Sequence, residues 1–469
     1  MTFTPPLLDI ADLIADPVAP AAFPETRLRW RNERLAAEIG LAGLSDAAWI
    51  NHFAKFEPLA GNLPEPLALR YHGHQFGSYN PQLGDGRGFL FAQVPGRAGR
   101  VFDLGTKGSG QTPYSRQGDG RLTLKGAVRE LLATSYLEAL GVATSGTLSI
   151  IETGEPLWRG DEPSPTRSAV LVRMQQSHIR FGTFQRLAYL DDAAGVERLL
   201  SHCVATYHPG AKRAAPAETA AAFLAQVSAA TARMVAQWMA SGFVHGVMNT
   251  DNFNIIGETF DFGPYRFLPR SDPNFVAAYF DETGLYRFGR QPTQALWALQ
   301  RLGSALLSLA PAEALAEALS GFEAAYQQAF ARHTLFLLGV KDGADLASDL
   351  AFLQTYYGWM TQSEADWPQT FFDLFGGAAS EARWRTSPQA ALYSGADFSP
   401  VEAGLRARVP DRPERLGHSY FQRARPADLV IETIESAWAD IDGRDDWSGV
   451  HALIDDFQHL GAALGPGGD

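Results

Sequence analysis

Hydrophobic and polar positions change their spacing along this chain. Between residues 66 and 178, short and nearly continuous apolar runs alternate with turn-forming residues, at 88–94 (GFLFAQV), 101–106 (VFDLGT), 144–154 (TSGTLSIIETG) and 167–175 (RSAVLVRMQ). Runs of this length, rich in Val, Ile and Phe and bounded by glycine, predict β-strands. We therefore expect a β-rich region in the first half of the chain.

Apolar residues at helical spacing predict helices in the other segments. A helix at 122–141 interrupts the strands, and Gly141 is suited to end it. A long helix follows at 217–242, with several more between 292 and 360. An amphipathic piece at 34–54 stands ahead of the strands. The chain thus reads as strands first and helices afterwards, which predicts an α+β fold.

Composition and charge narrow the class of protein. The 469 residues are 46% hydrophobic and 19% charged, an ordinary globular composition that can bury a large core. A net charge of -13 argues against a nucleic-acid partner, because such proteins usually carry a basic surface. No apolar run approaches the roughly 18 residues of a membrane helix, so we expect no membrane partner. We expect a monomer.

Cysteine usage bears on the compartment. The chain has one cysteine, Cys203, so neither an intramolecular disulfide nor a cysteine metal site can form. The N-terminus also lacks a basic stretch followed by an apolar core, the pattern of a signal peptide. Both observations favour a reducing, cytoplasmic location.

Two short motifs indicate phosphate chemistry. Asp261 opens the triplet Asp-Phe-Gly, ten residues after Asp251 and nine after Asn252. Protein kinases use a catalytic-loop Asn and the Asp of such a triplet to hold a divalent metal on ATP. The run 253–260 between them reads as two short strands around Gly257, a hairpin that would bring both side chains to one metal.

The same region departs from the kinase pattern. Kinases place their catalytic Asp two residues after a conserved His, and here the residue two after His245 is Val247. The nearest carboxylate is Asp251. The pattern therefore predicts a kinase-type nucleotide site whose base has moved or whose reaction differs.

Glycines and basic residues extend this site. The loop 84–88 (Gly-Asp-Gly-Arg-Gly) lies between strand-like runs, and Lys107 follows about twenty residues later at the end of a strand. Glycines let backbone N–H groups approach phosphates, and a kinase lysine at such a distance pairs with a helix glutamate, here Glu130. The alternatives are a tight turn for the loop and, for Glu130, a solvated face or a pair with Arg129.

Three further positions carry open alternatives. Asp119, within Gly-Asp-Gly-Arg at 118–121, either contacts a ligand or, like Thr123, caps the following helix. Arg173 and Arg180 bracket the expected junction of the two regions. Two arginines there suit phosphate better than a purine edge, although salt bridges between the regions would also explain them.

These motifs combine into a recognisable set. The segments YHGHQFG, LGDGRG, DLGTKGSGQTPYSRQGDGR, VHGVMNTDN and DFGP resemble the selenoprotein O/YdiU family, over about residues 20–400. The resemblance implies a protein-kinase-like bilobal fold. We expect an N-terminal extension over 1–65 packed on the main fold, a β-rich nucleotide-binding lobe over 66–178, a helical lobe over 179–410 and a C-terminal extension over 411–469.

The resemblance also implies an activity and its residues. Members transfer AMP from ATP to Ser, Thr or Tyr hydroxyls of proteins, with ATP flipped relative to kinases so that the α-phosphate faces the acceptor. Asp251 is then the proton acceptor, Asn252 and Asp261 bind Mg²⁺ or Mn²⁺, and Glu130 supports Lys107. The residues expected to contact the nucleotide are Gly84, Gly86, Arg87, Lys107, Asp119, Gly120, Arg173, Arg180 and Asp261.

Other functions stay open at this point. An ordinary phosphotransferase would transfer the γ-phosphate, and Val247 argues against it. A pseudokinase scaffold would bind ATP without turnover, and the intact metal pair argues against that. Bacterial members are also associated with UMP transfer from UTP with manganese. Relatives carry selenocysteine or cysteine near the C-terminus, and this chain has neither.

Overall fold

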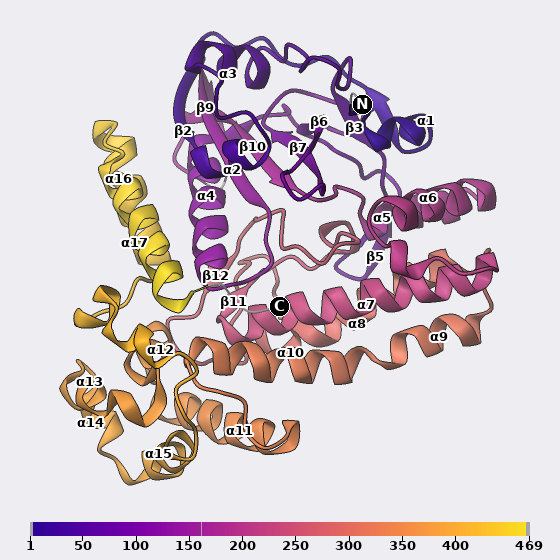
Figure 1. Ribbon diagram of the computed structural model, residues 1–469. Coiled ribbons are helices and arrows are strands. Elements are labelled where there is room, and N and C mark those ends of the chain that lie inside the picture. The colour runs from indigo at the N-terminus through magenta and orange to yellow at the C-terminus, as the bar shows by residue number, and fades with distance from the viewer. Residues whose placement is uncertain (1–2, 161, 466–469) are drawn as a thin grey trace.

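The computed structural model describes residues 3–160 and 162–465 and is a mixed α+β structure (Figure 1). The expectation of an α+β fold is confirmed. One antiparallel sheet has the strand order β1-β3-β6-β7-β10-β9-β2, and β8 also pairs with β10. Its strands are β1 (Ala15–Pro17), β2 (Arg27–Arg31), β3 (Leu67–Leu69), β6 (Gly88–Pro95), β7 (Val101–Lys107), β8 (Leu122–Thr123), β9 (Gly146–Leu157) and β10 (Thr166–Gln175).

Two small two-stranded sheets and many helices complete the fold. The small sheets pair β4 (Gly73–Gln75) with β5 (Ser78–Asn80) and β11 (Phe243–Val244) with β12 (Arg266–Phe267). The helices are α1 (Ala11–Ile14), α2 (Glu33–Glu38), α3 (Asp46–Phe53), α4 (Leu124–Ala139), α5 (Phe181–Tyr189), α6 (Ala193–Thr206), α7 (Pro216–Ala240), α8 (Gln291–Ala305), α9 (Ala312–Ser320), α10 (Phe322–Leu337), α11 (Leu346–Ser363), α12 (Trp367–Leu374), α13 (Glu381–Thr386), α14 (Ala390–Tyr393), α15 (Ser399–Arg406), α16 (Ile431–Arg444) and α17 (Ser448–Leu464).

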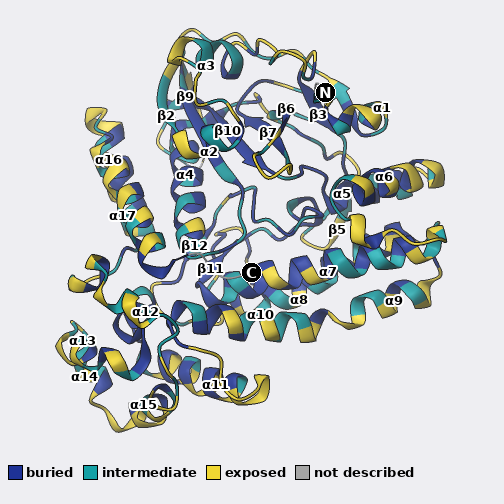
Figure 2. Cartoon of the chain, viewed as in Figure 1, coloured by how far each residue is buried: buried dark blue, intermediate teal, exposed yellow. Residues whose placement is uncertain are grey.

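The central strands are apolar on both faces because both faces are covered. Along β10, Ala169 and Leu171 join the large core that includes α4, while Val170 and Val172 join a second core with α2 and α3. Alternate residues of a strand point to opposite faces, so a continuous apolar run fits a sheet packed on each side. Figure 2 shows these strands in the buried colour, with exposed residues on the outer helices.

The N-terminal segment supplies more than an outer layer. It contributes β1 at one edge of the sheet and β2 at the other. The amphipathic piece at 34–54 forms two helices rather than one, because α2 is followed by Gly40 in the left-handed region (φ 74°) and Ser45 then caps α3.

The hairpin predicted for 253–260 is wrong. Asn254 makes a single bridge to Arg180, and Thr259 makes one to Thr144, so the two ends of the run pair with different segments. The side-chain oxygen of Asn254 accepts hydrogen bonds from the backbone N–H groups of three following residues, at 3.1, 2.9 and 3.2 Å. This local Asn turn takes the donors that a hairpin would need.

The C-terminal helices α16 and α17 lie beside α4 (Figure 1). Phe457 of α17 packs on Tyr136 of α4 with ring centroids 4.9 Å apart, and the Tyr136 hydroxyl donates to the Ala427 carbonyl at 3.3 Å. The C-terminal segment therefore buries the face of α4 that points away from the sheet. Within the described ranges, no helix is long and apolar enough to cross a membrane.

This packing predicts a stability cost for losing one ring. Phe457→Ala should lower the free energy of unfolding by about 3 kcal/mol, because it removes a buried phenyl group from the α4–α17 contact. The exposed Asp455→Ala on the same helix serves as the control and should cost less than about 0.5 kcal/mol. Urea denaturation followed by circular dichroism measures both, and equal stability of the two variants would contradict this packing.

Candidate active site

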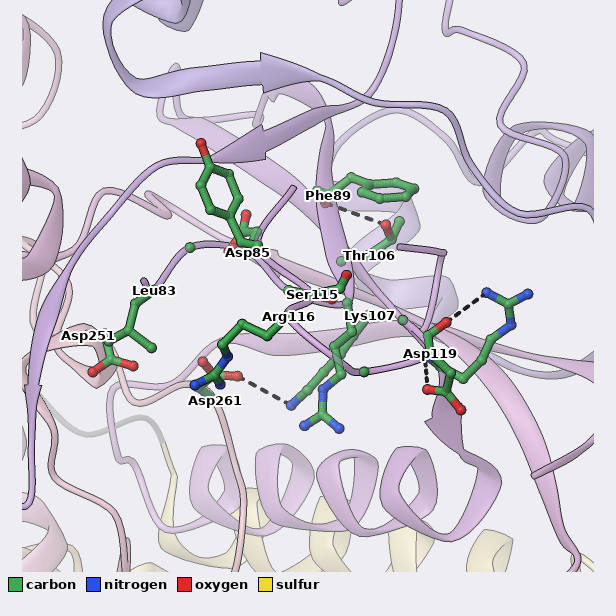
Figure 3. A pocket seen from close by; sticks show the side chains of 18 of the residues that line it. Leu83, Asp85, Phe89, Thr106, Lys107, Ser115, Arg116, Asp119, Asp251 and Asp261 are labelled. Carbon is green, nitrogen blue, oxygen red and sulfur yellow. Dashed lines mark hydrogen bonds and ion pairs between the residues drawn. The ribbon is translucent and has the colours of Figure 1, made fainter. Parts of the chain in front are cut away.

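A cavity of about 690 Å³ opens beside the sheet (Figure 3). It is lined by residues from β6, β7 and β10, from the 108–121 loop between β7 and β8, and by Asp251 and Asp261. Most residues singled out in the sequence line it, namely Gly84, Gly86, Arg87, Lys107, Asp119, Gly120, Arg173, Arg180, Asp251 and Asp261. Glu130 lies behind Lys107, and Asn252 is outside the lining.

Lys107 is the last residue of β7, and it lines the cavity as a buried side chain. Its ammonium donates to Glu130 Oε2 of α4 at 2.8 Å, so the ion pair expected from the spacing is present. The other carboxylate oxygen of Glu130 is buried, and no hydrogen bond to it is formed within the described structure. Because α4 packs on the sheet, this pair fixes the distance between helix and strand at the cavity.

Asp261 gathers three cations around one carboxylate. Its oxygens lie 3.3 Å from Lys107 Nζ, 3.3 Å from Arg173 Nη1 and 2.8 Å from Arg180 Nη1. Burial by itself raises the pKa of Asp261, but the charges of Lys107, Arg180 and Arg173 outweigh it and hold that pKa well below its ordinary value. The residue also has a left-handed backbone, with φ 61°. Such a conformation, unusual for a residue other than glycine, is typical of functional sites.

Arg180 is a fully buried arginine that links several segments. It precedes α5, donates to the Asp251 backbone carbonyl at 2.8 Å and pairs with Asp85 at 3.3 Å. Its guanidinium lies over the rings of Tyr71 (4.4 Å) and Phe260 (4.8 Å). Stacking and pairing on all sides hold this charge in a fixed orientation at the cavity floor.

Asp251 is a buried carboxylate with spare hydrogen-bonding capacity. Its Oδ1 is buried and accepts no hydrogen bond from the residues that the structure describes. Burial raises the pKa of Asp251 to about 6, although the nearby Arg180 acts in the opposite direction. A carboxyl group with this pKa can accept a proton near neutral pH and release it again.

Close packing explains the glycines of the 84–88 loop. A Cβ at Gly84 would stand 2.3 Å from the Tyr114 ring, and one at Gly86 would stand 3.0 Å from the Tyr114 carbonyl oxygen. The 108–121 loop therefore lies directly across the glycine loop. Larger residues at 84 and 86 would push the two loops apart and open the roof of the cavity.

Asp119 and Gly120 lie at another part of the lining, with Arg159 and Trp158. Asp119 pairs with Arg159 at 2.8 Å and accepts from the Arg121 N–H at 2.9 Å, whereas the cap of α4 is Thr123, which accepts from the Gly126 N–H at 3.1 Å. The capping alternative thus applies to Thr123 and not to Asp119. Trp158 also lines the cavity and is 71% exposed.

Sequence reasoning missed several lining residues. Arg116 has a left-handed backbone (φ 54°) and extends across the cavity toward the side where Asp251 and Asp261 lie (Figure 3). Arg116 and Arg87 each form no ion pair with a carboxylate of the described residues. His178 accepts from Arg173 Nε at 3.1 Å and fixes that side chain. Arg116 lies in the motif SRQGDGR, so its positive charge beside that motif could have indicated a phosphate contact. Nothing in the sequence marked His178 or Trp158 as lining residues.

Comparison with known proteins shows the family to which this chain belongs. The model of the family "Protein adenylyltransferase SelO" matches residues 1–458. Proteins named "Protein nucleotidyltransferase YdiU" align with 43% identity from Synechocystis sp., covering 98% of each chain, and with 41% identity from Synechococcus elongatus, covering 100% of this chain and 97% of that one. This chain belongs to the SelO family.

The SelO match corrects the expected extent of the resemblance and supports the expectation that the chain is an enzyme. The family match extends beyond residues 20–400 and ends at residue 458, within α17. A further relative, from Gloeobacter violaceus, is 42% identical over 97% of this chain. Membership of a family of nucleotidyltransferases makes the chain an enzyme of that class.

The residues near Asp251 have the chemistry of a hard-metal site. Asn252 donates from Nδ2 to the Val247 carbonyl at 2.9 Å and is outside the cavity lining, whereas the carboxylates of Asp251 and Asp261 both line the cavity. Among residues 3–160 and 162–465, no three or more His, Cys, Asp or Glu side chains form a metal-binding group. Mg²⁺ commonly takes one or two protein oxygens and completes its shell with phosphates and water, so this donor set fits such an ion.

The cation cluster predicts a stability cost at Asp261. Asp261→Asn should lower the free energy of unfolding by about 2–3 kcal/mol, because three buried cations lose their shared carboxylate. Asp119→Asn is the matched control in the same cavity and should cost less than about 1 kcal/mol, since it faces solvent with one arginine partner. Denaturant melts without nucleotide measure both, and an unchanged Asp261→Asn would contradict the cluster's role.

Proposed function

We propose that this enzyme is a protein adenylyltransferase that moves AMP from ATP to Ser, Thr or Tyr hydroxyls of proteins. The proposal includes a protein-kinase-like bilobal arrangement, which is supported by a main sheet packed with α4 and followed in the chain by mostly helical structure from α5 onward. The Lys107–Glu130 pair and Asp261 at the cavity are the features that such a lobe arrangement uses to hold a nucleotide.

One observation carries the proposal. In a chain of the SelO family, three buried cations surround Asp261, and a buried carboxylate, Asp251, adjoins them with a free oxygen. The cations suit a triphosphate, and the carboxylate suits the proton of an incoming hydroxyl. Val247 supplies no carboxylate at the usual kinase position, so Asp251 is the available base.

The distribution of charge supports a phosphate-first orientation of ATP. Lys107, Arg173 and Arg180 line the cavity as buried residues, whereas Trp158, which also lines it, is exposed. Fixed cations bind a triphosphate most strongly where they are shielded from water, and an aromatic face binds an adenine ring by stacking. We therefore place the β- and γ-phosphates near the arginines, which leaves the α-phosphate for the acceptor.

Asp251 and the cations divide the chemistry. Asp251 accepts the proton of the acceptor hydroxyl, the hydroxyl oxygen forms a bond to the α-phosphorus, and the bond from that phosphorus to pyrophosphate breaks. Lys107, Arg173 and Arg180 stabilise the charge that collects on the departing pyrophosphate. Asn252 and Asp261 would hold Mg²⁺ or Mn²⁺, which when bound neutralises phosphate charge.

Label position tests the proposal. The purified protein is incubated with α-labelled or γ-labelled ATP, a divalent metal and a mixture of unfolded proteins as acceptors, and incorporation is read by mass. Label from the α position alone, with a gain of one AMP, is the expected result, and a chelator should remove it. Label from the γ position would instead identify a phosphotransferase, and binding of ATP without label would favour a scaffold. A parallel reaction with UTP and manganese separates UMP transfer.

The base assignment predicts a separation of chemistry from binding. Asp251→Asn should lower the rate of AMP transfer by about 10²–10⁴-fold, because the hydroxyl loses its proton acceptor, while ATP affinity stays within a few-fold. Asp342→Asn, an exposed carboxylate on a loop, is the control and should match the wild type. Single-turnover transfer and isothermal titration measure the two quantities. Full transfer activity in Asp251→Asn would rule out this base.

A further inference from the structure

We propose that three exposed aromatic side chains, one of them anchored to the segment that holds Asp251, form a docking surface for the acceptor protein. These residues, here called the acceptor patch, are Phe76, Tyr279 and Phe280. The occupant is the polypeptide segment that carries the acceptor hydroxyl, and the patch selects segments with an aromatic or large aliphatic residue close to that hydroxyl. The inference rests on the proposed function and specifies its acceptor.

The acceptor patch is unusually exposed for its composition. Phe76 is 39% exposed, Tyr279 81% and Phe280 46%. Phe280 packs against Phe76 at 5.9 Å and against Tyr279 at 5.1 Å between ring centroids, in edge-to-face geometry. Single exposed apolar residues are common on protein surfaces, but aromatic rings gathered on one surface mark an interaction site.

The patch is built onto the segment that holds Asp251. The Phe76 N–H donates to Asn249 Oδ1 at 3.2 Å and to the Tyr286 hydroxyl at 3.1 Å, and that hydroxyl donates to the same Asn249 oxygen at 2.9 Å. The His74 N–H donates to Thr250 Oγ1 at 2.8 Å. The β4–β5 hairpin is thus fixed to residues one and two positions before Asp251.

The hairpin also touches the carboxylate side of the site. A Cβ at Gly73 would stand 2.8 Å from Asp251 Oδ1, and Gln75, next to Phe76, lines the cavity. A hydroxyl that reaches Asp251 arrives on a polypeptide that continues across the neighbouring surface. The β4–β5 hairpin adjoins Asp251, and Phe76 at its tip brings the acceptor patch to that surface.

Local structure holds these rings in place rather than leaving them on a loose loop. Phe76 has a left-handed backbone (φ 49°) and is followed by Gly77 (φ 80°), a tight turn that turns Phe76 outward. In the 271–290 segment, the buried Asp281 accepts from the N–H groups of Leu285 and Tyr286 at 2.9 and 2.8 Å. A fixed aromatic surface loses little conformational entropy on binding a partner.

The size of the patch fits a transient substrate. Three side chains can contact a few residues of an extended segment, which is far less than a stable protein–protein interface buries. One aromatic or aliphatic anchor on the segment would supply most of the binding. An enzyme that modifies and releases its acceptor needs contacts of this modest strength.

Peptides that differ at one residue test the inference. The probes are synthetic peptides with a single Ser, Thr or Tyr, and with either Phe or Ala at each of the four positions on both sides. AMP transfer from α-labelled ATP is measured for the wild type, for Tyr279→Ala/Phe280→Ala and for Val409→Ala, an exposed apolar residue distant in sequence. The wild type should favour a Phe peptide by about tenfold in kcat/KM, through KM. The double variant should reduce that preference to below about twofold, with ATP affinity unchanged, and Val409→Ala should retain it.

Each other outcome is decisive. Equal use of Phe and Ala peptides by the wild type, or an undiminished preference in the double variant, overturns the acceptor patch while AMP transfer itself stands. A double variant that loses only self-modification between copies would make the surface a contact between two copies and also overturns the inference. No AMP transfer to any peptide or protein overturns the proposed function, and this inference with it. Unchanged thermal stability of the double variant confirms that it is folded.

Discussion

The shared carboxylate of Asp261 is the interaction on which this site depends. Lys107 comes from β7, Arg173 from β10 and Arg180 from the start of α5, and each lies within 3.3 Å of that one side chain. Three buried cations would repel one another strongly without it. The carboxylate therefore ties the sheet to the helical region and keeps the cations gathered at the place proposed here for the triphosphate.

The surroundings give two neighbouring carboxylates opposite properties. Cations outweigh burial at Asp261 and hold its pKa well below the ordinary range, whereas burial dominates at Asp251 and raises its pKa to about 6. A permanently ionised group suits metal and cation binding, while a group that titrates near neutrality suits proton transfer. Both residues lie within ten positions of the chain, and tertiary packing divides their roles.

Contacts on two sides of the site hold its residues in position. Behind it, Glu130 reaches Lys107 from α4, and α17 covers α4 through the contact between Tyr136 and Phe457. The family match reaches residue 458, within α17, although the C-terminal helices contribute no residue to the cavity lining. In front of it, the β4–β5 hairpin connects the Asp251 segment to exposed rings such as Phe280.

The sequence alone determined the α+β class, most strands and long helices, and the Lys107–Glu130 pair, because these follow from apolar spacing and from motifs a few tens of residues long. Only the tertiary structure decided the turn at 253–260, the place of Arg116 over the cavity and the edge strands β1 and β2. The ends of the 253–260 segment bridge to Arg180 and Thr144, and each edge strand pairs with a strand far from it in the chain. The spacing of apolar residues along the chain predicts helices and strands but not such long-range contacts, because these depend on how the elements pack against one another.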